Sequence, residues 1–158
     1  MKFALRDYEP ADFDMLYEID RACYPPEIAY SKRELHVYLR MPGAECIVAE
    51  AANAAVGFCI SAHRDTHGYI VTIDVLEEFR RTGIGSALLS EVERRLAVNG
   101  VREVRLETAT YNESAVAFWQ KHGYRSLGIR KKYYPGGRDA FAMSKAIPSS
   151  RRKSSELE

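Results

Sequence analysis

Cysteine is scarce in this chain of 158 residues, and the cysteines that are present show no pairing pattern. The three cysteines, Cys23, Cys46 and Cys59, are odd in number, widely spaced and form no CxxC motif, which argues against a disulfide framework and a zinc site. The four histidines are also scattered, without the spacing of metal ligands. We therefore expect no metal, and a reducing compartment such as the cytoplasm.

Excess charge and long apolar runs are absent as well. The formal net charge is +1, which gives no electrostatic argument for a nucleic acid or a membrane as a partner. No apolar run approaches the roughly 20 residues of a membrane span, and the first residues lack the apolar segment of a secretion signal. The basic run 151–153 is soon followed by Glu156 and Glu158, so residues 149–158 are interpreted as a solvated tail. Residues 1–148 have a length that suits one domain with one sizeable core.

The hydrophobic pattern predicts alternating groups of strands and helices. Strands are expected over residues 2–6, 46–51, 56–63, 69–75, 104–108, 124–132 and 141–147. Helices are expected over residues 12–23, from the cap Ser31 to just before Pro42, from the turn at 80–86 to Asn99-Gly100, and from Asn112 to His122-Gly123. Ser31 with Glu34 forms a capping box, and Asn53 and His67-Gly68 mark turns between strands. The resulting order, β-α-α-β-β-β-α-β-α-β-β, indicates a single α/β domain of the α+β kind with an antiparallel meander.

The glycine-rich turn from Arg80 to Ser86 is the most informative stretch of the sequence. It leads into an amphipathic helix whose first turn offers unpaired N–H groups and a positive dipole end, so it is suited to an anion. Gly83 and Gly85 allow the backbone to approach a phosphate closely. A Walker loop is excluded because Gly-Lys-Ser/Thr is absent, and a dinucleotide fingerprint is excluded because Leu88 stands where a third glycine is needed. What remains is a diphosphate held by backbone amides, or a tight turn that binds nothing.

Two blocks of the sequence resemble the GNAT superfamily of N-acetyltransferases. Arg80-x-x-Gly83-x-Gly85 is similar to the loop that binds the diphosphate of acetyl-CoA in that family, and 112–124 is similar to its Asn-x-x-Ala-x-x-Phe-Tyr-x-Lys-x-Gly-Phe block. With their flanks the two blocks span roughly residues 69–145. The resemblance implies a central, mixed and mostly antiparallel sheet with helices on both faces. It also implies a V-shaped opening between two parallel strands, 69–75 and 104–108.

The resemblance further implies that acetyl-CoA is the co-substrate and that certain residues bind it. Backbone groups of one strand would hold the pantetheine arm, and the glycine-rich loop would hold the diphosphate. Asn112 would contact the thiol end, and Trp119 would pack against the cofactor. The residues implied in binding are Ile73, Asp74, Val75, Arg80, Arg81, Thr82, Gly83, Ile84, Gly85, Ser86, Asn112 and Trp119.

Within the superfamily, the chain most resembles the Nα-acetyltransferases, which include the ribosomal-protein alanine type. The strand that begins at Tyr69 is similar to one that starts with a functional tyrosine in a eukaryotic subgroup. The loop 130–140 resembles a Tyr-Tyr-Pro loop that walls the N-terminus of the substrate, which assigns Tyr133 and Tyr134 to substrate binding. The implied partner is a protein or peptide N-terminus, and the chain is expected to be a monomer or a homodimer.

The expected reaction is a direct acyl transfer, in which a neutral amine attacks a thioester while a base removes a proton. Glu107 aligns with the catalytic glutamate of the alanine-type enzymes and is the candidate base, acting through a water; a merely solvated strand glutamate is the alternative. Tyr69 is the second catalytic candidate, as an orienting or base-assisting phenol. Many members carry a tyrosine, proposed to protonate the leaving thiolate, where this chain has Trp119, and an indole cannot donate a proton in this way. Either Tyr133 or Tyr134 substitutes, or no acid is needed because a thiol of pKa about 8.5 leaves readily as thiolate.

The pKa of the acceptor favours an N-terminal amine over a lysine. An α-amine has a pKa of about 7.7 to 8, whereas a lysine at about 10.4 costs roughly 4.6 kcal/mol more to deprotonate at pH 7 than a group of pKa near 7. A single carboxylate acting through water suits the easier acceptor. Two alternatives stay open: an acetyltransferase for a small amine (a polyamine, an antibiotic or an amino acid), and a non-catalytic acyl-CoA-binding module, which Trp119 keeps in play.

Overall fold

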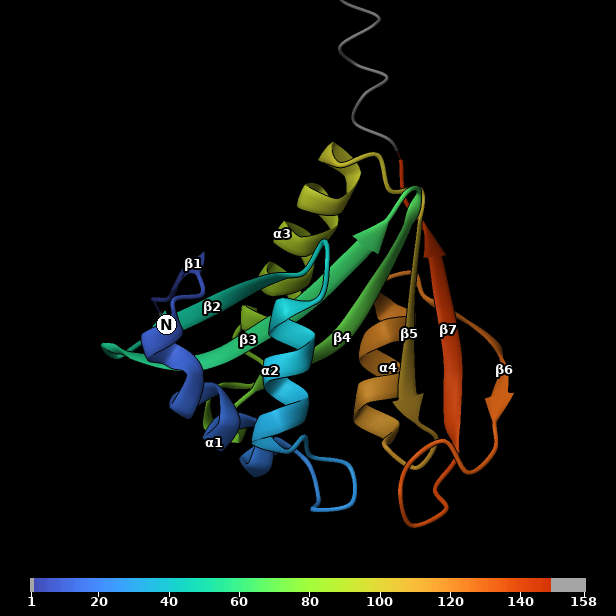
Figure 1. Ribbon diagram of the computed structural model, residues 1–158, viewed down its shortest axis with the longest axis horizontal. Helices are drawn as coiled ribbons and strands as arrows, with labels where there is room; N and C mark the ends of the chain where they lie inside the picture. Colours follow the sequence, from blue (N-terminus) through green and yellow to red (C-terminus); the bar gives the residue numbers. More distant parts are fainter. Residues whose placement is uncertain (1, 149–158) are drawn as a thin grey trace, which may run out of the picture.

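A computed structural model describes residues 2–148 of the chain. All of its strands belong to one twisted sheet (Figure 1). Its strand order is β1-β2-β3-β4-β5-β7-β6, and every neighbouring pair is antiparallel except β4 and β5, which are parallel. The strands are β1 (Ala4–Asp7), β2 (Glu45–Ala51), β3 (Ala54–Arg64), β4 (His67–Val75), β5 (Glu103–Ala109), β6 (Arg125–Arg130) and β7 (Ala140–Ala146). The mixed, mostly antiparallel sheet expected from the sequence is therefore confirmed, while the expected tail 149–158 lies outside the described residues.

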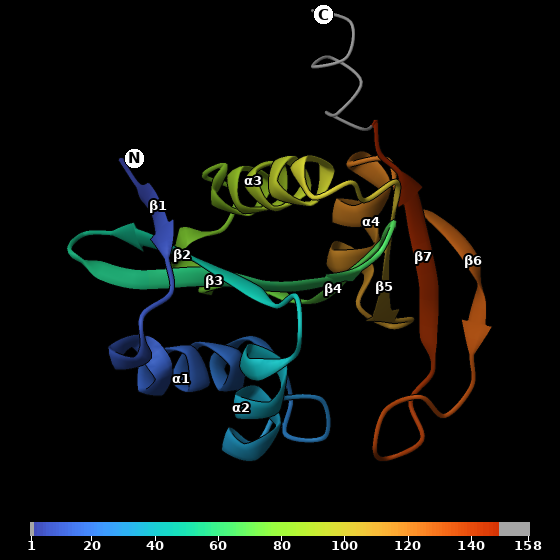
Figure 2. The ribbon, with the colours of Figure 1, turned by 45° about the horizontal axis from the view of Figure 1, so that its top comes forward.

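Helices cover both faces of the sheet, as Figure 2 shows. The first pair, α1 (Phe13–Cys23) and α2 (Lys32–Arg40), lies on one face, and α3 (Ile84–Val98) and α4 (Glu113–Lys121) lie on the other. Two short 3-10 helices, η1 (Pro10–Asp12) and η2 (Glu77–Phe79), precede α1 and the glycine-rich loop. The predicted order of strands and helices is confirmed, and only the 3-10 turns are additional.

Each face of the sheet has its own apolar core. On the α3 face, the apolar stripe of the predicted amphipathic helix is fully buried, and it consists of Ile84, Leu88, Leu89, Val92 and Leu96. On the other face, Leu16 and Ile19 of α1 and Leu35 of α2 pack with Phe58 and Ile60 of β3. Each fully buried side chain of this size contributes roughly 1.5–3 kcal/mol to folding, so both helix layers are firmly attached to the sheet that carries the site.

Local signals in the sequence set most of the element ends. The Ser31 hydroxyl accepts a hydrogen bond from the Glu34 backbone N–H (3.1 Å), and the Glu34 carboxylate accepts one from the Ser31 N–H (2.9 Å), so the capping box is confirmed. The predicted turn at His67-Gly68 is wrong, because the chain turns two residues earlier at Asp65, in the left-handed region with φ of 54°. Gly68 instead lies inside β4, where a Cβ would come within 3.1 Å of Leu96 and Val101. Its small size serves the packing of α3 on the sheet.

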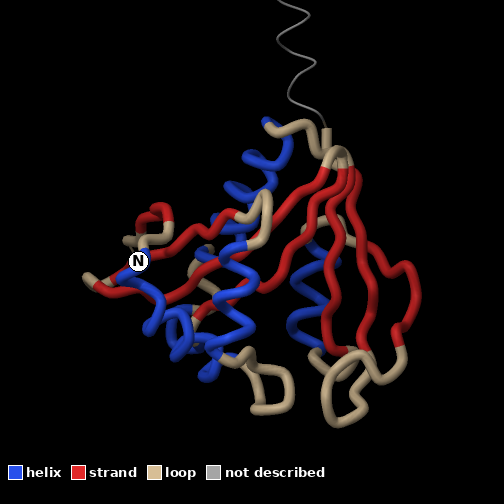
Figure 3. The backbone as a smooth tube through the Cα atoms, viewed as in Figure 1, coloured by secondary structure: helices blue, strands red, loops and turns tan. Residues whose placement is uncertain are grey.

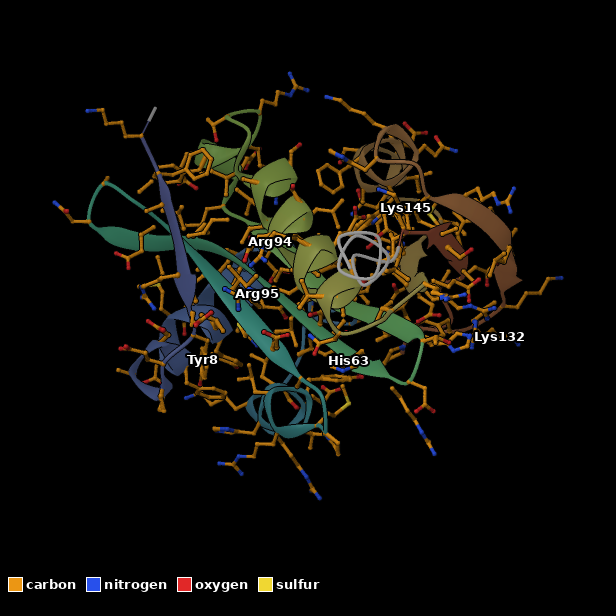
Figure 4. The ribbon with its side chains drawn as sticks, turned by 90° about the horizontal axis from the view of Figure 1, so that it is seen from above. Tyr8, His63, Arg94, Arg95, Lys132 and Lys145 are labelled. Carbon is orange, nitrogen blue, oxygen red and sulfur yellow. The ribbon has the colours of Figure 1, made fainter. Side chains whose placement is uncertain are left out.

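Ion pairs on α3 tie this helix to the edge of the sheet. Arg95, labelled on α3 in Figure 4, donates to Glu91 at 2.7 Å. It also reaches Asp7 at the end of β1, again at 2.7 Å. Hydrogen bonds from Arg94 and Arg95 lower the pKa of Glu91 to about 2. These ion pairs therefore help to hold α3 in place on the sheet.

The parallel strands β4 and β5 stay together for only three residue pairs, His67–Glu103, Gly68–Val104 and Tyr69–Arg105. Beyond these pairs β4 continues beside β3 as far as Val75, and β5 continues beside β7 as far as Ala109. The two strands thus diverge, and Figure 1 shows the opening between them. The V-shaped opening expected from the sequence is confirmed.

Candidate active site

A cleft lies in the opening between β4 and β5 and has a volume of about 60 Å³. Its sides are residues 69–73 of β4 and 106–109 of β5. Two connections close one end: the α1–α2 connection, which contributes Tyr24, Ile28 and Tyr30, and the β6–β7 loop, which contributes Tyr133 and Tyr134. Figure 3 shows both connections at the same end of the molecule. The lining is therefore rich in aromatic side chains contributed by segments that are distant in the sequence.

Glu107 lies at the centre of a hydrogen-bonded cluster in this cleft. Its side chain is only 9% exposed, and its Oε1 accepts hydrogen bonds from the hydroxyls of Tyr69 and of Tyr133, the latter at 3.2 Å. The Nε of Arg130 lies 3.7 Å from Oε2. Among the described residues that line the cleft, Glu107 is the only carboxylate. It is held in one orientation by hydroxyl donors from β4 and the β6–β7 loop and by the charge of Arg130 on β6.

The phenols around Glu107 keep their protons at neutral pH. Burial, followed by the hydrogen bond to Glu107, raises the pKa of Tyr69 far above its usual value. Burial likewise raises the pKa of Tyr133 and of Tyr134. These three side chains are consequently hydrogen-bond donors and not phenolate bases, which leaves Glu107 as the acceptor-only group of the cluster.

The edge of β4 that faces the opening carries backbone groups without strand partners. The carbonyls of Val71 and Ile73 point into the opening, where they accept hydrogen bonds from the hydroxyls of Tyr30 (3.3 Å) and Tyr24 (3.2 Å). The Val75 carbonyl accepts one from the Nε of Arg80 (2.9 Å). In an extended strand the N–H and C=O of one residue point the same way, so the N–H groups of these residues also face the opening.

The glycine-rich loop places the start of α3 beyond the end of β4. Arg81 and Gly83 have positive φ of 63° and 90°, and Gly83 is the N-cap of α3 without a side-chain capping bond. The first intrahelical bond runs from the Ala87 N–H to the Gly83 carbonyl (2.9 Å), so the N–H groups of Ile84, Gly85 and Ser86 have no partner inside the helix. A Cβ on Gly85 would lie 3.2 Å from Phe118, so this glycine also permits α4 to pack against α3. The geometry fits a bound anion.

The other predicted residues fall in two groups. Asn112 and Trp119 line the cleft; the Asn112 Oδ1 caps α4 by accepting from the Ala115 N–H (3.2 Å), and Trp119 is 5% exposed, with its ring edge-on to Phe118. Asp74 differs, because its side chain is buried away from the cleft beside α1 and its backbone groups, which alternate with those of Ile73 and Val75, face β3.

Sequence reasoning missed three residues that shape the cleft: Tyr24, Tyr30 and, as a partner of Glu107, Arg130. The two tyrosines flank Pro25-Pro26 in the α1–α2 connection. Aromatic residues in a proline-containing loop were the only available signal for them. The contact of Arg130 with Glu107 joins positions on two different strands and has no local signal.

The described part of the chain contains no helix that is both long and apolar enough to cross a membrane. Across residues 2–148 there is also no cluster of three or more histidine, cysteine or acidic side chains that could hold a metal ion.

Comparison with known proteins places these features in context. A family model described as the acetyltransferase (GNAT) family matches residues 13–124. An N-alpha-acetyltransferase of Sulfurisphaera tokodaii is 28% identical over 156 residues, covering 90% of this chain and 92% of that protein. A putative ribosomal protein bS18-alanine N-acetyltransferase of Bacillus subtilis is 28% identical, covering 90% and 94%. The crystal structure of Ard1 from Thermoplasma volcanium superposes with a TM-score of 0.82 at 26% identity, covering 94% of this chain and 99% of that one.

Proposed function

This chain belongs to the GNAT acetyltransferase family and is an acyltransferase, and we propose that it transfers the acetyl group of acetyl-CoA directly to the α-amine at the N-terminus of a protein or peptide. The observation that carries the proposal is the cleft at the divergence of β4 and β5, with Glu107 fixed between Tyr69 and Tyr133. The names of the S. tokodaii and B. subtilis relatives support the same acceptor. A cytoplasmic location and a monomeric or homodimeric state stay predictions.

The residues present fit acetyl-CoA at both of its ends. The free N–H groups of Ile84, Gly85 and Ser86, with Arg80 and Arg81 exposed beside them, suit the diphosphate. The open edge of β4 at Ile73–Val75 suits the amide groups of the pantetheine arm. The bound co-substrate supplies the activated acetyl group as a thioester, and the β4 N–H groups that face the opening would donate to its carbonyl oxygen.

Glu107 would act as the base for the acceptor amine, and Tyr69 would orient it. An α-amine of pKa about 7.7 to 8 is partly neutral at pH 7, so the base needs only to take the proton released during the attack. Glu107 would accept this proton through a water. The hydrogen of the Tyr69 hydroxyl is committed to Glu107, and its oxygen lone pairs would therefore orient the amine N–H. Tyr133 and Tyr134 would enclose the peptide N-terminus, and Trp119 would pack against the cofactor.

Thiol release from acetyl-CoA, with the site of acetylation located by mass spectrometry, tests the proposal. The panel contains peptides with a free N-terminus, the same peptides with a blocked N-terminus and an internal lysine, and free polyamines and amino acids. We expect turnover with free N-termini and acetyl on the α-nitrogen. Faster turnover of the blocked peptides or of the small amines would replace the proposed acceptor. Binding of acetyl-CoA without turnover of any amine would indicate a binding module instead.

A further inference from the structure

Two aspartates outside the proposed chemistry are the only carboxylates that are fully buried in the described chain. Asp20 of α1 is 0% exposed and Asp74 of β4 is 1% exposed. They lie close enough between the helix and the strand for each to change the pKa of the other. Asp20 Oδ1 and Asp74 Oδ2 have no hydrogen-bond partner among the described residues. A carboxylate cannot donate, so the two acids can satisfy these oxygens by a bond to each other only if one of them keeps its proton.

The remaining oxygen of each acid is already satisfied. Asp20 Oδ2 accepts from the backbone N–H of Tyr30 (2.7 Å), and Asp74 Oδ1 accepts from the Thr72 hydroxyl (2.5 Å). Burial raises the pKa of both acids, and that of Asp74 well above that of an ordinary carboxyl group. The pair therefore retains a proton, and a single proton between the two acids would satisfy both orphaned oxygens.

The segment that this pair holds is the wall of the cleft. The Asp20 side chain accepts a hydrogen bond from the backbone N–H of Tyr30, which is the last residue before the N-cap of α2. Tyr24 directly follows α1. The hydroxyls of Tyr24 and Tyr30 donate to carbonyls of β4 on the open edge. Segment 24–30 is thus fixed to β4 by two hydrogen bonds and to α1 by a third, and Tyr24, Ile28 and Tyr30 present their side chains to the cleft.

We propose that Asp74 donates a shared proton to Asp20, and that this pair is a positioning device that fixes segment 24–30 as the wall against which the acceptor peptide binds. The positioning role rests on the proposed function. The shared proton rests only on the burial of the two acids and on their two oxygens that lack a donor.

Two variants of similar size separate hydrogen bonding from packing at position 74. Asp74→Asn keeps an N–H donor for Asp20, whereas Asp74→Leu fills the space without one and leaves Asp20 as an unpaired buried acid. We expect the peptide KM to stay within about twofold of wild type for Asp74→Asn and to rise about tenfold or more for Asp74→Leu, with the KM for acetyl-CoA within about twofold in both. Equal peptide KM values for the two variants would overturn the positioning role.

Carboxyl ¹³C NMR of aspartate-labelled protein tests the proton without any turnover, and does so even where Asp74→Leu fails to fold. At pH 7, the resonance that disappears in Asp74→Asn should have the chemical shift of a neutral carboxylic acid. A carboxylate shift for that resonance would overturn the shared proton. Failure to acetylate any peptide would remove the proposed function, whereas this spectrum decides the state of the pair independently.

Discussion

Glu107 in the cleft and Asp74 behind its wall differ in their surroundings, and the difference separates their roles. Glu107 keeps 9% exposure and is held by phenol hydroxyls and Arg130, so it can exchange a proton with water in the cleft. Asp74 is enclosed against Asp20 and away from the cleft. One acid is therefore suited to proton transfer, and the other to holding structure.

The buried pair predicts a pH dependence of stability whose sign is set by Asp74. Unfolded, Asp74 releases its proton above about pH 4, whereas the folded protein retains it because the pKa is raised. The folded state then binds more protons than the unfolded state, so this pair's contribution to stability falls as pH rises from about 4 toward the folded pKa. Asp74→Asn has no such proton to lose on unfolding, so it avoids this loss of stability. The difference between its free energy of unfolding and that of wild type should therefore increase between pH 5 and pH 8.

Urea denaturation at the two pH values checks this prediction, and Asp65→Asn, in an exposed turn, corrects for the change in net charge. Other ionisable groups lie close enough to interact electrostatically with the pair: Cys23, Tyr24, Tyr30, Glu34, Cys46, Cys59 and Arg80. Burial raises the pKa of the thiols and phenols, so they stay neutral through pH 8. A stability difference that is constant with pH would show that Asp74 is ionised in the folded protein.

At the scale of elements, the loop before α3 depends on backbone conformation more than on side chains. Gly83 has φ of 90° and open space where a Cβ would stand, and Gly128 of β6 shares both properties, with φ of 137°. Alanine at either position costs about 1–2 kcal/mol of strain. We expect calorimetry to show acetyl-CoA binding about tenfold weaker or more for Gly83→Ala and unchanged for the matched control Gly128→Ala. Equal affinities in the two variants would mean that this loop does not hold the diphosphate.

The sequence predicts those elements whose signals are local. The capping box at Ser31, the apolar stripe of α3 and the glycine-rich loop are each set by residues within a few positions of one another, and each is confirmed in the fold. The prediction of a turn at His67-Gly68 is wrong because glycine is common in turns, whereas tight packing against Leu96 is what requires Gly68.

The site is predictable only in part, since its contacts join distant positions. Tyr69 and Glu107 are 38 residues apart, and Glu107 and Tyr133 are 26 apart. Family resemblance, not periodicity, pointed to them. The pairing of Asp20 with Asp74 has no local signal at all, because an aspartate on a helix is ordinarily exposed.

At the scale of the whole molecule, three residue pairs join the two halves of the sheet at β4 and β5. A co-substrate bound between these strands would bridge the halves. Acetyl-CoA at about 100 times its Kd should stabilise the fold by about 2.7 kcal/mol, and hydrogen exchange should slow at residues 70–75. Thermal denaturation measures the first effect, with Gly83→Ala giving a smaller shift at the same concentration. Stabilisation without protection of 70–75 would place the co-substrate elsewhere.

The role of this cleft is tested most directly by measuring two quantities for Glu107→Gln, its kcat with a peptide substrate and its Kd for acetyl-CoA. Glutamine preserves the size of the side chain but cannot take a proton, so kcat with a peptide substrate should fall roughly 10²- to 10⁴-fold. The Kd for acetyl-CoA should stay at the wild-type value, and Glu103→Gln, on the same strand outside the cleft, should retain full activity. Wild-type kcat in Glu107→Gln would contradict the assignment of the base and of the cleft as the catalytic centre.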